Sequence, residues 1–89
     1  MGSKAFYCVE GHLPKFELKM ARENFLLSWE NVNAICASDD YLALSFDCEF
    51  GHVQFVSPES LAELFESLQM ENLRMIDGRK LNCKMIKPE

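Results

Sequence analysis

The sequence has 89 residues, of which 48% are hydrophobic and 26% are charged, and it carries a formal net charge of −5. This length and composition support one modest hydrophobic core, so we expect a single domain over residues 5–88. No apolar run approaches the roughly 20 residues that span a bilayer, and no apolar secretory segment stands near the N-terminus. The sequence therefore predicts an intracellular protein, nuclear or cytoplasmic, without a membrane partner.

The charge is distributed unevenly along the chain. Residues 1–71 carry a net charge of −8, whereas residues 72–89 carry +3. Because binding of a polyanion depends strongly on Lys and Arg, the acidic part disfavours nucleic acid. A phosphate group would be held at the basic C-terminal end.

The spacing of cysteine and histidine matches no metal-binding motif. The cysteines lie far apart, and His12 and His52 lack the spacing of a paired metal site. We therefore predict no metal and no cofactor, and we expect the thiols to be reduced. The four cysteines are Cys8, Cys36, Cys48 and Cys83.

The N-terminal third is predicted to contain one strand followed by one helix. A short strand over residues 5–9 ends in a turn rich in structure-breaking residues over 10–14. Residues 15–20 alternate, which fits either a short strand or a loop that tucks Phe16 and Leu18 under the domain; we favour the loop. Helical spacing of apolar residues then predicts a helix over 22–37, with Trp29 in the core. The residues that show this spacing are Phe25, Trp29, Val32 and Cys36.

Two strands are predicted in the middle of the chain. The first covers residues 41–47, with Leu42, Leu44 and Phe46 facing the core. A short acidic turn leads to the second, over 48–55. In this strand Phe50, His52 and Gln54 share one face, while Gly51, Val53 and Phe55 share the other.

A second helix and a last strand complete the predicted domain. Ser57 followed by Pro58 is a typical helix start, and apolar residues at helical spacing carry the helix to residues 69–72. A turn at Asp77-Gly78 precedes a strand over 79–88. In that strand Leu81, Cys83 and Met85 are expected to face inward, and Asn82, Lys84 and Ile86 outward.

The stretch from Cys48 to Phe55 resembles the octamer of the third strand of the RNA recognition motif (RRM) family. The family pattern is Lys/Arg, Gly, aromatic, Gly/Ala, aromatic, aliphatic, any residue, aromatic. Phe50 and His52 match the two stacking positions, whereas Cys48 and Glu49 depart from the cation and the Gly. Tyr7, within Phe6-Tyr7-Cys8, resembles the aromatic of the first-strand hexamer. The chain is thus similar to an atypical, acidic RRM.

The resemblance implies an α+β, ferredoxin-like βαββαβ fold, with a four-stranded antiparallel sheet and two helices on one face. In this fold the first and third strands are central, so Tyr7, Phe50 and His52 become neighbours. The ferredoxin-like acyl phosphatases need an Arg after the first strand, and residues 10–14 contain none. No enzymatic activity is therefore predicted.

The resemblance further implies binding of short single-stranded RNA on the sheet. Tyr7, Phe50 and His52 would stack on bases, and Gln54 and Asn82 would contact base edges. Phosphates would be held by Arg79, Lys84 and Lys87. The acidic body, with Cys48 and Glu49, equally fits an alternative function, a protein–protein interaction module of the same fold with little RNA affinity.

Overall fold

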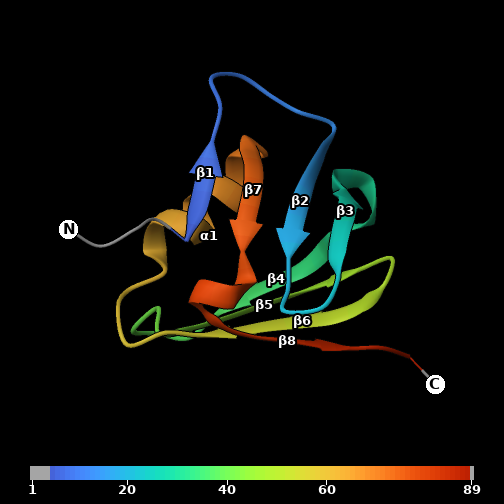
Figure 1. Ribbon diagram of the computed structural model, residues 1–89. Helices are drawn as coiled ribbons and strands as arrows, with labels where there is room; N and C mark the ends of the chain where they lie inside the picture. Colours follow the sequence, from blue (N-terminus) through green and yellow to red (C-terminus); the bar gives the residue numbers. More distant parts are fainter. Residues whose placement is uncertain (1–4, 89) are drawn as a thin grey trace.

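The computed structural model describes residues 5–88, which form a mainly β protein with two four-stranded sheets (Figure 1). The strands are β1 (Phe6–Cys8), β2 (Lys15–Lys19), β3 (Asn24–Ser28), β4 (Asn33–Ala37), β5 (Ala43–Cys48), β6 (Gly51–Val56), β7 (Leu73–Asp77) and β8 (Asn82–Ile86). The described residues contain one α-helix, α1 (Ala62–Met70), and two short 3-10 helices, η1 (Trp29–Asn31) and η2 (Gly78–Lys80).

The two sheets are linked where the chain bends from one to the other. Sheet A has the strand order β1-β7-β2-β3, and its β2 and β7 run parallel. Sheet B has the order β4-β5-β6-β8 and is antiparallel throughout. The chain passes from sheet A to sheet B at η1 and again at η2. In Figure 1 the strands of sheet A stand over those of sheet B and run in a different direction, as in two-sheet packings whose corners are made by bent strands.

The hydrophobic core lies between the two sheets. Alternate residues of each strand face inward, so that β2 contributes Phe16 and Leu18 while β3 contributes Phe25 and Leu27, all of them buried. The Phe16 ring packs against Trp29 with ring centroids 4.4 Å apart. The predicted core position of Trp29 is confirmed. From sheet B the core receives Leu44, Phe46, Val53 and Phe55.

Helix α1 closes one side of the core and links β6 of sheet B to β7 of sheet A. Leu64 and Leu68, one turn apart, are buried, and the helix lies behind β1 and β7 in Figure 1. The chain leaves the helix at Glu71, which has the left-handed conformation (φ 55°) common at helix ends. Among residues 5–88, no helix is long and apolar enough to cross a membrane.

The predicted ferredoxin-like βαββαβ fold is wrong, because the segment predicted as its first helix forms strands. Residues 22–37 contain β3, η1 and β4. Phe25 and Trp29 are four residues apart, a spacing that fits the helical period and also two periods of a strand. Burial of Leu27 between them shows that the period of two holds. The favoured loop at 15–20 is also wrong, since these residues form β2.

The second half of the chain follows the sequence more closely. Strand β8 and helix α1 lie within the predicted segments, although the helix starts at Ala62 instead of Pro58, and β5 and β6 each end one residue beyond theirs. Ser57 instead accepts a hydrogen bond from the Glu59 N–H at 3.1 Å in the turn before the helix. Strand β7 had no counterpart in the prediction, because only four residues separate the expected helix end from the Asp77-Gly78 turn.

Candidate interaction surface on sheet B

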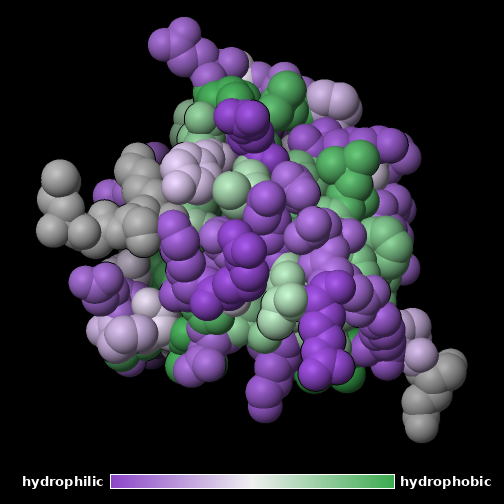
Figure 2. All heavy atoms as spheres, viewed as in Figure 1, coloured by the Kyte–Doolittle hydropathy of each residue, from purple (hydrophilic) through white to green (hydrophobic). Residues whose placement is uncertain are grey.

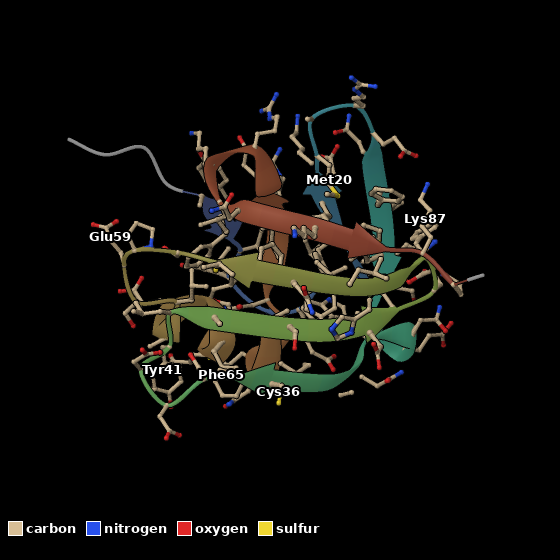
Figure 3. All side chains as sticks on the ribbon, turned by 90° about the horizontal axis from the view of Figure 1, so that it is seen from below. Met20, Cys36, Tyr41, Glu59, Phe65 and Lys87 are labelled. Atoms are coloured by element: carbon tan, nitrogen blue, oxygen red, sulfur yellow. The ribbon has the colours of Figure 1, made fainter. Side chains whose placement is uncertain are left out.

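Sheet B presents an outer face that no other described element covers. Its strands alternate, so the residues between the buried ones point away from the core. Figure 3 looks onto this face, with β8, β6, β5 and β4 side by side. The outer face of sheet B consists of Cys36, Ala43, Ser45, Asp47, His52, Gln54, Val56, Asn82, Lys84 and Ile86.

The strand register arranges these side chains in cross-strand rows. Residues directly opposite one another on antiparallel strands touch, so the rows form one continuous surface. Val56 and Ile86 are 54% and 51% exposed, and the row between them contains Gln54 and Lys84. The rows are Cys36–Ser45–Gln54–Lys84, Asp47–His52–Ile86 and Ala43–Val56–Asn82.

A hydrogen bond fixes the imidazole of this surface. Nδ1 of His52 and Oδ1 of Asp47 lie 2.7 Å apart on neighbouring strands. The bond holds the ring along the cross-strand row and places a carboxylate beside it. A phosphate approaching His52 would therefore meet a negative charge, which disfavours nucleic acid at this point.

A shallow hollow of about 440 Å³ lies on the β4 side of the outer face. No charged residue lines it, so it suits an apolar or uncharged side chain of a ligand. The lining residues are Cys36, Ala37, Ser38, Ala43, Leu44, Ser45, Gln54 and Val56.

The structure brings together four of the eight residues predicted from the sequence to contact RNA. His52, Gln54, Asn82 and Lys84 all belong to the outer face of sheet B. Gln54 lies opposite Lys84, and both are exposed. The predicted outward orientation of Asn82 and Lys84 is thus confirmed.

Phe50 does not lie on this surface. It occupies the turn between β5 and β6, and its ring packs on Phe25 with centroids 4.9 Å apart. In the same turn the Glu49 carboxylate accepts hydrogen bonds from the Ser28 N–H at 3.2 Å and from the Asn31 side chain at 3.4 Å. The turn is thereby docked on β3 of the other sheet.

Tyr7 is also separated from the surface. It lies on β1, at the edge of sheet A, opposite Met75 of β7. The expected stacking platform of Tyr7, Phe50 and His52 is therefore not assembled, because β1 and β6 belong to different sheets.

The two remaining predicted cations are engaged in ion pairs. Arg79 of η2 pairs with Asp77 through Nε–Oδ1 at 2.8 Å and Nη2–Oδ2 at 2.9 Å. This bidentate pair holds the pKa of the buried Asp77 carboxyl at about 2 and raises the pKa of the guanidinium. Lys87 Nζ lies 3.4 Å from Glu23 Oε1 and 5.8 Å from the centre of the Phe25 ring.

Two of the thiols are poor nucleophiles. Burial raises the pKa of Cys83 to about 12 and also raises the pKa of Cys48. Both therefore stay protonated at neutral pH, whereas the reactive form of a cysteine is the thiolate. No group of three or more potential metal ligands occurs among residues 5–88.

Comparison of the chain with protein-family models, with curated proteins and with solved structures finds no match. The RRM resemblance therefore stays a prediction from the octamer.

Sequence reasoning missed part of this surface. Cys36 lies on β4, and the helix predicted for this segment concealed its place beside Ser45. Alternation did predict Ser45 and Ile86 to face outward, but nothing in the sequence marked them as contact residues. The exposed Val56 was omitted because the predicted strand ended one residue earlier.

Proposed function

We propose that this domain is a protein-interaction module and that the outer face of sheet B is its binding surface. The observation that supports this is the composition of the uncovered face: two exposed aliphatic residues, Val56 and Ile86, lie among polar ones of which two are charged, beside an uncharged hollow. Surfaces that bind proteins combine apolar contacts with hydrogen-bonding groups in this way.

Electrostatics favours a protein over RNA as the ligand. The outer face carries one Lys, Lys84, and one carboxylate, Asp47, and the whole chain has a net charge of −5. RNA binding on a sheet needs several phosphate contacts and aromatic rings on which bases stack. The rings of Phe50 and Tyr7 lie elsewhere, and His52, the remaining predicted stacking ring, is hydrogen-bonded to Asp47, so the face retains one of the three expected stacking rings.

A second candidate function is weak binding of short single-stranded RNA to the same face. It is favoured by the shared position of His52, Gln54, Asn82 and Lys84, which offer hydrogen bonds and one positive charge. Arg79 and Lys80 belong to η2, between β7 and β8, but the charge of Arg79 is balanced by its pair with Asp77. This function needs no contact from Phe50.

Site-specific photo-crosslinking tests the proposal. A photo-reactive residue replaces Val56 on the outer face of sheet B, and a control chain carries it at Leu26, which is 56% exposed on sheet A. We expect the Val56 chain to form a protein adduct in its native host and the Leu26 chain to form none. Val56→Asp should abolish binding of the adduct protein, whereas Leu26→Asp should leave it unchanged.

An RNA titration supplies the opposing outcome. A randomised pool of short single-stranded RNA is added to the domain at low salt while amide chemical shifts are followed. Saturable shifts at His52, Gln54 and Lys84 that weaken with salt, combined with no protein adduct at position 56, would refute the protein-interaction function and support the RNA function.

A further inference from the structure

The two sheets end in four edge strands, and three of these edges are blocked. Strand β1 is only three residues long, and its pairing with β7 is irregular after Tyr7. Strand β4 pairs irregularly with β5, and Ala34 within it has a positive φ of 54°. At β3, the Ser28 N–H donates to Glu49, and the Phe50 ring covers Phe25. Short strands, bulges and covering groups all prevent an edge from pairing with another chain.

Strand β8 is neither short nor bulged, although Gly78 of η2 lies close to Cys83, and Lys87, just beyond the strand, contacts Glu23 and Phe25. All five of its residues pair with β6 in unbroken register, and no described strand pairs with its other edge. A regular edge of this length presents a row of backbone N–H and C=O groups to an incoming strand. Figure 3 shows β8 at the border of the sheet, with Lys87 just beyond its C-terminal end.

The charges around β8 define which strand would fit. Of the cations within residues 79–87, Arg79 pairs with Asp77 and Lys87 pairs with Glu23. Lys84 stands exposed at the centre of the strand. Like charges directly opposite destabilise a strand pair and opposite charges stabilise it, so this edge disfavours a second copy of itself and favours an acidic segment.

The size of the outer face also calls for an additional contact. Four strands of five or six residues cover roughly 400 Å², about half of what one partner usually contributes to a stable interface. A strand added at β8 would enlarge the contact without any change in the fold.

We propose that the free edge of β8 binds an extended acidic segment of the partner protein, which adds to sheet B as a fifth strand. This inference rests on the proposed function and specifies its binding mode. The segment would place an acidic side chain opposite Lys84. Its alternate residues would be apolar, because they would face Cys83 and Met85, which pack against the core.

The test uses a capped synthetic peptide, roughly seven residues long, in which Val alternates with Glu. Two further peptides carry N-methyl groups on one or the other set of alternate amides. Backbone pairing needs only the amides that face β8, so one methylated peptide should fail to bind and the other should bind. We expect the bound domain to show slower amide hydrogen exchange in β8 and no change in β1 or β4.

A charge reversal completes the test. Lys84→Glu should weaken binding of the unmodified peptide roughly tenfold or more, whereas the control Lys15→Glu, on β2 of the other sheet, should have no effect. Three results would overturn the inference. They are equal binding of the two methylated peptides, slower amide hydrogen exchange at another edge strand, and no saturable change in the amide chemical shifts of β8 at roughly 1 mM peptide.

The two proposals can fail separately. If the protein crosslinked at position 56 binds Lys84→Glu as well as it binds the unaltered chain, the function stands and the β8 mode is wrong. If no protein is crosslinked at position 56 while β8 still binds the peptide, the outer face is not the binding surface, but the edge mode stands.

Discussion

The substitution Phe50→Ala separates a structural role from a ligand-binding role for the most conspicuous residue of the octamer. Phe50 is 38% exposed and packs on Phe25. A Phe side chain in this environment buries on the order of 100 Å², which corresponds to about 2.5 kcal/mol, and Ala retains part of it. Since no closed cavity forms at a half-exposed site, we expect a loss of about 2 kcal/mol in the free energy of unfolding.

Chemical denaturation monitored by Trp29 fluorescence measures this loss. For a domain of this size the change corresponds to a decrease in Tm of roughly 10 °C. Tyr7→Ala is the matched control, because Tyr7 is 40% exposed and its ring packs on no other aromatic ring among residues 5–88. We expect it to cost about 1 kcal/mol or less. A double-mutant cycle with Phe25→Leu should show a coupling of about 1 kcal/mol between the two rings.

The opposite result would refute the reasoning. If Phe50→Ala leaves the free energy of unfolding unchanged within about 0.5 kcal/mol and abolishes binding of RNA, then Phe50 is a contact residue and the RRM resemblance describes its function.

Three further substitutions, one of them with a control, test the fold and its edges. Gly51→Ala should destabilise the domain by more than about 3 kcal/mol or prevent folding, because Gly51 has φ 138° and an added Cβ would overlap backbone atoms of β8. The control Gly11→Ala, where φ is positive but the space is open, should cost about 1 kcal/mol in the same denaturation assay. Asp77→Asn should lower stability by about 1–2 kcal/mol at neutral pH, since the carboxyl paired with Arg79 has its pKa lowered from 3.8 to about 2. This stabilisation is present above pH 3.8 and is lost as the pH falls to about 2. The variant should therefore show a flatter acid-denaturation profile, and an unchanged profile would refute this role of Asp77. Lys84→Val should cause self-association, visible by sedimentation at roughly 100 µM, and a monomeric variant would show that this Lys does not protect the edge.

The sequence predicted well those strands whose neighbours in space are also neighbours in the chain. Strands β5 and β6 form a hairpin, and alternation of Leu44 and Phe46 with polar residues gave their buried face correctly. The outward set of β8 followed from the same period. Four residues that share one face of sheet B were therefore grouped correctly without knowledge of the fold.

The sequence could not reveal how the N-terminal half is shared between the sheets. Strands β2 and β3 form a hairpin in which alternation was visible for β2 alone, and β2 also pairs in parallel with β7, which lies more than fifty residues away. Such pairing leaves no local signal. The bend at Trp29 carries the chain from one sheet to the other and interrupts the period of two, and this is why the segment suggested a helix.

The packing of the β5–β6 hairpin explains the RRM-like order of residues 48–55. Glu49 accepts hydrogen bonds from the end of β3, and Phe50 covers Phe25. At position 51 the backbone of β8 approaches so closely that only Gly fits, and Val53 and Phe55 fill the core. In an RRM the same order of aromatic, small and apolar residues would arise because an exposed central strand must stack bases on one face and pack helices on the other. Here it arises because the turn between β5 and β6 must pack against β3 of the other sheet. Similar sequences can thus serve different structures. The residues that distinguish this hairpin from an RRM strand are those that depart from the family pattern, Cys48 and Glu49. Cys48 is partly buried, and Glu49 accepts a hydrogen bond from the other sheet.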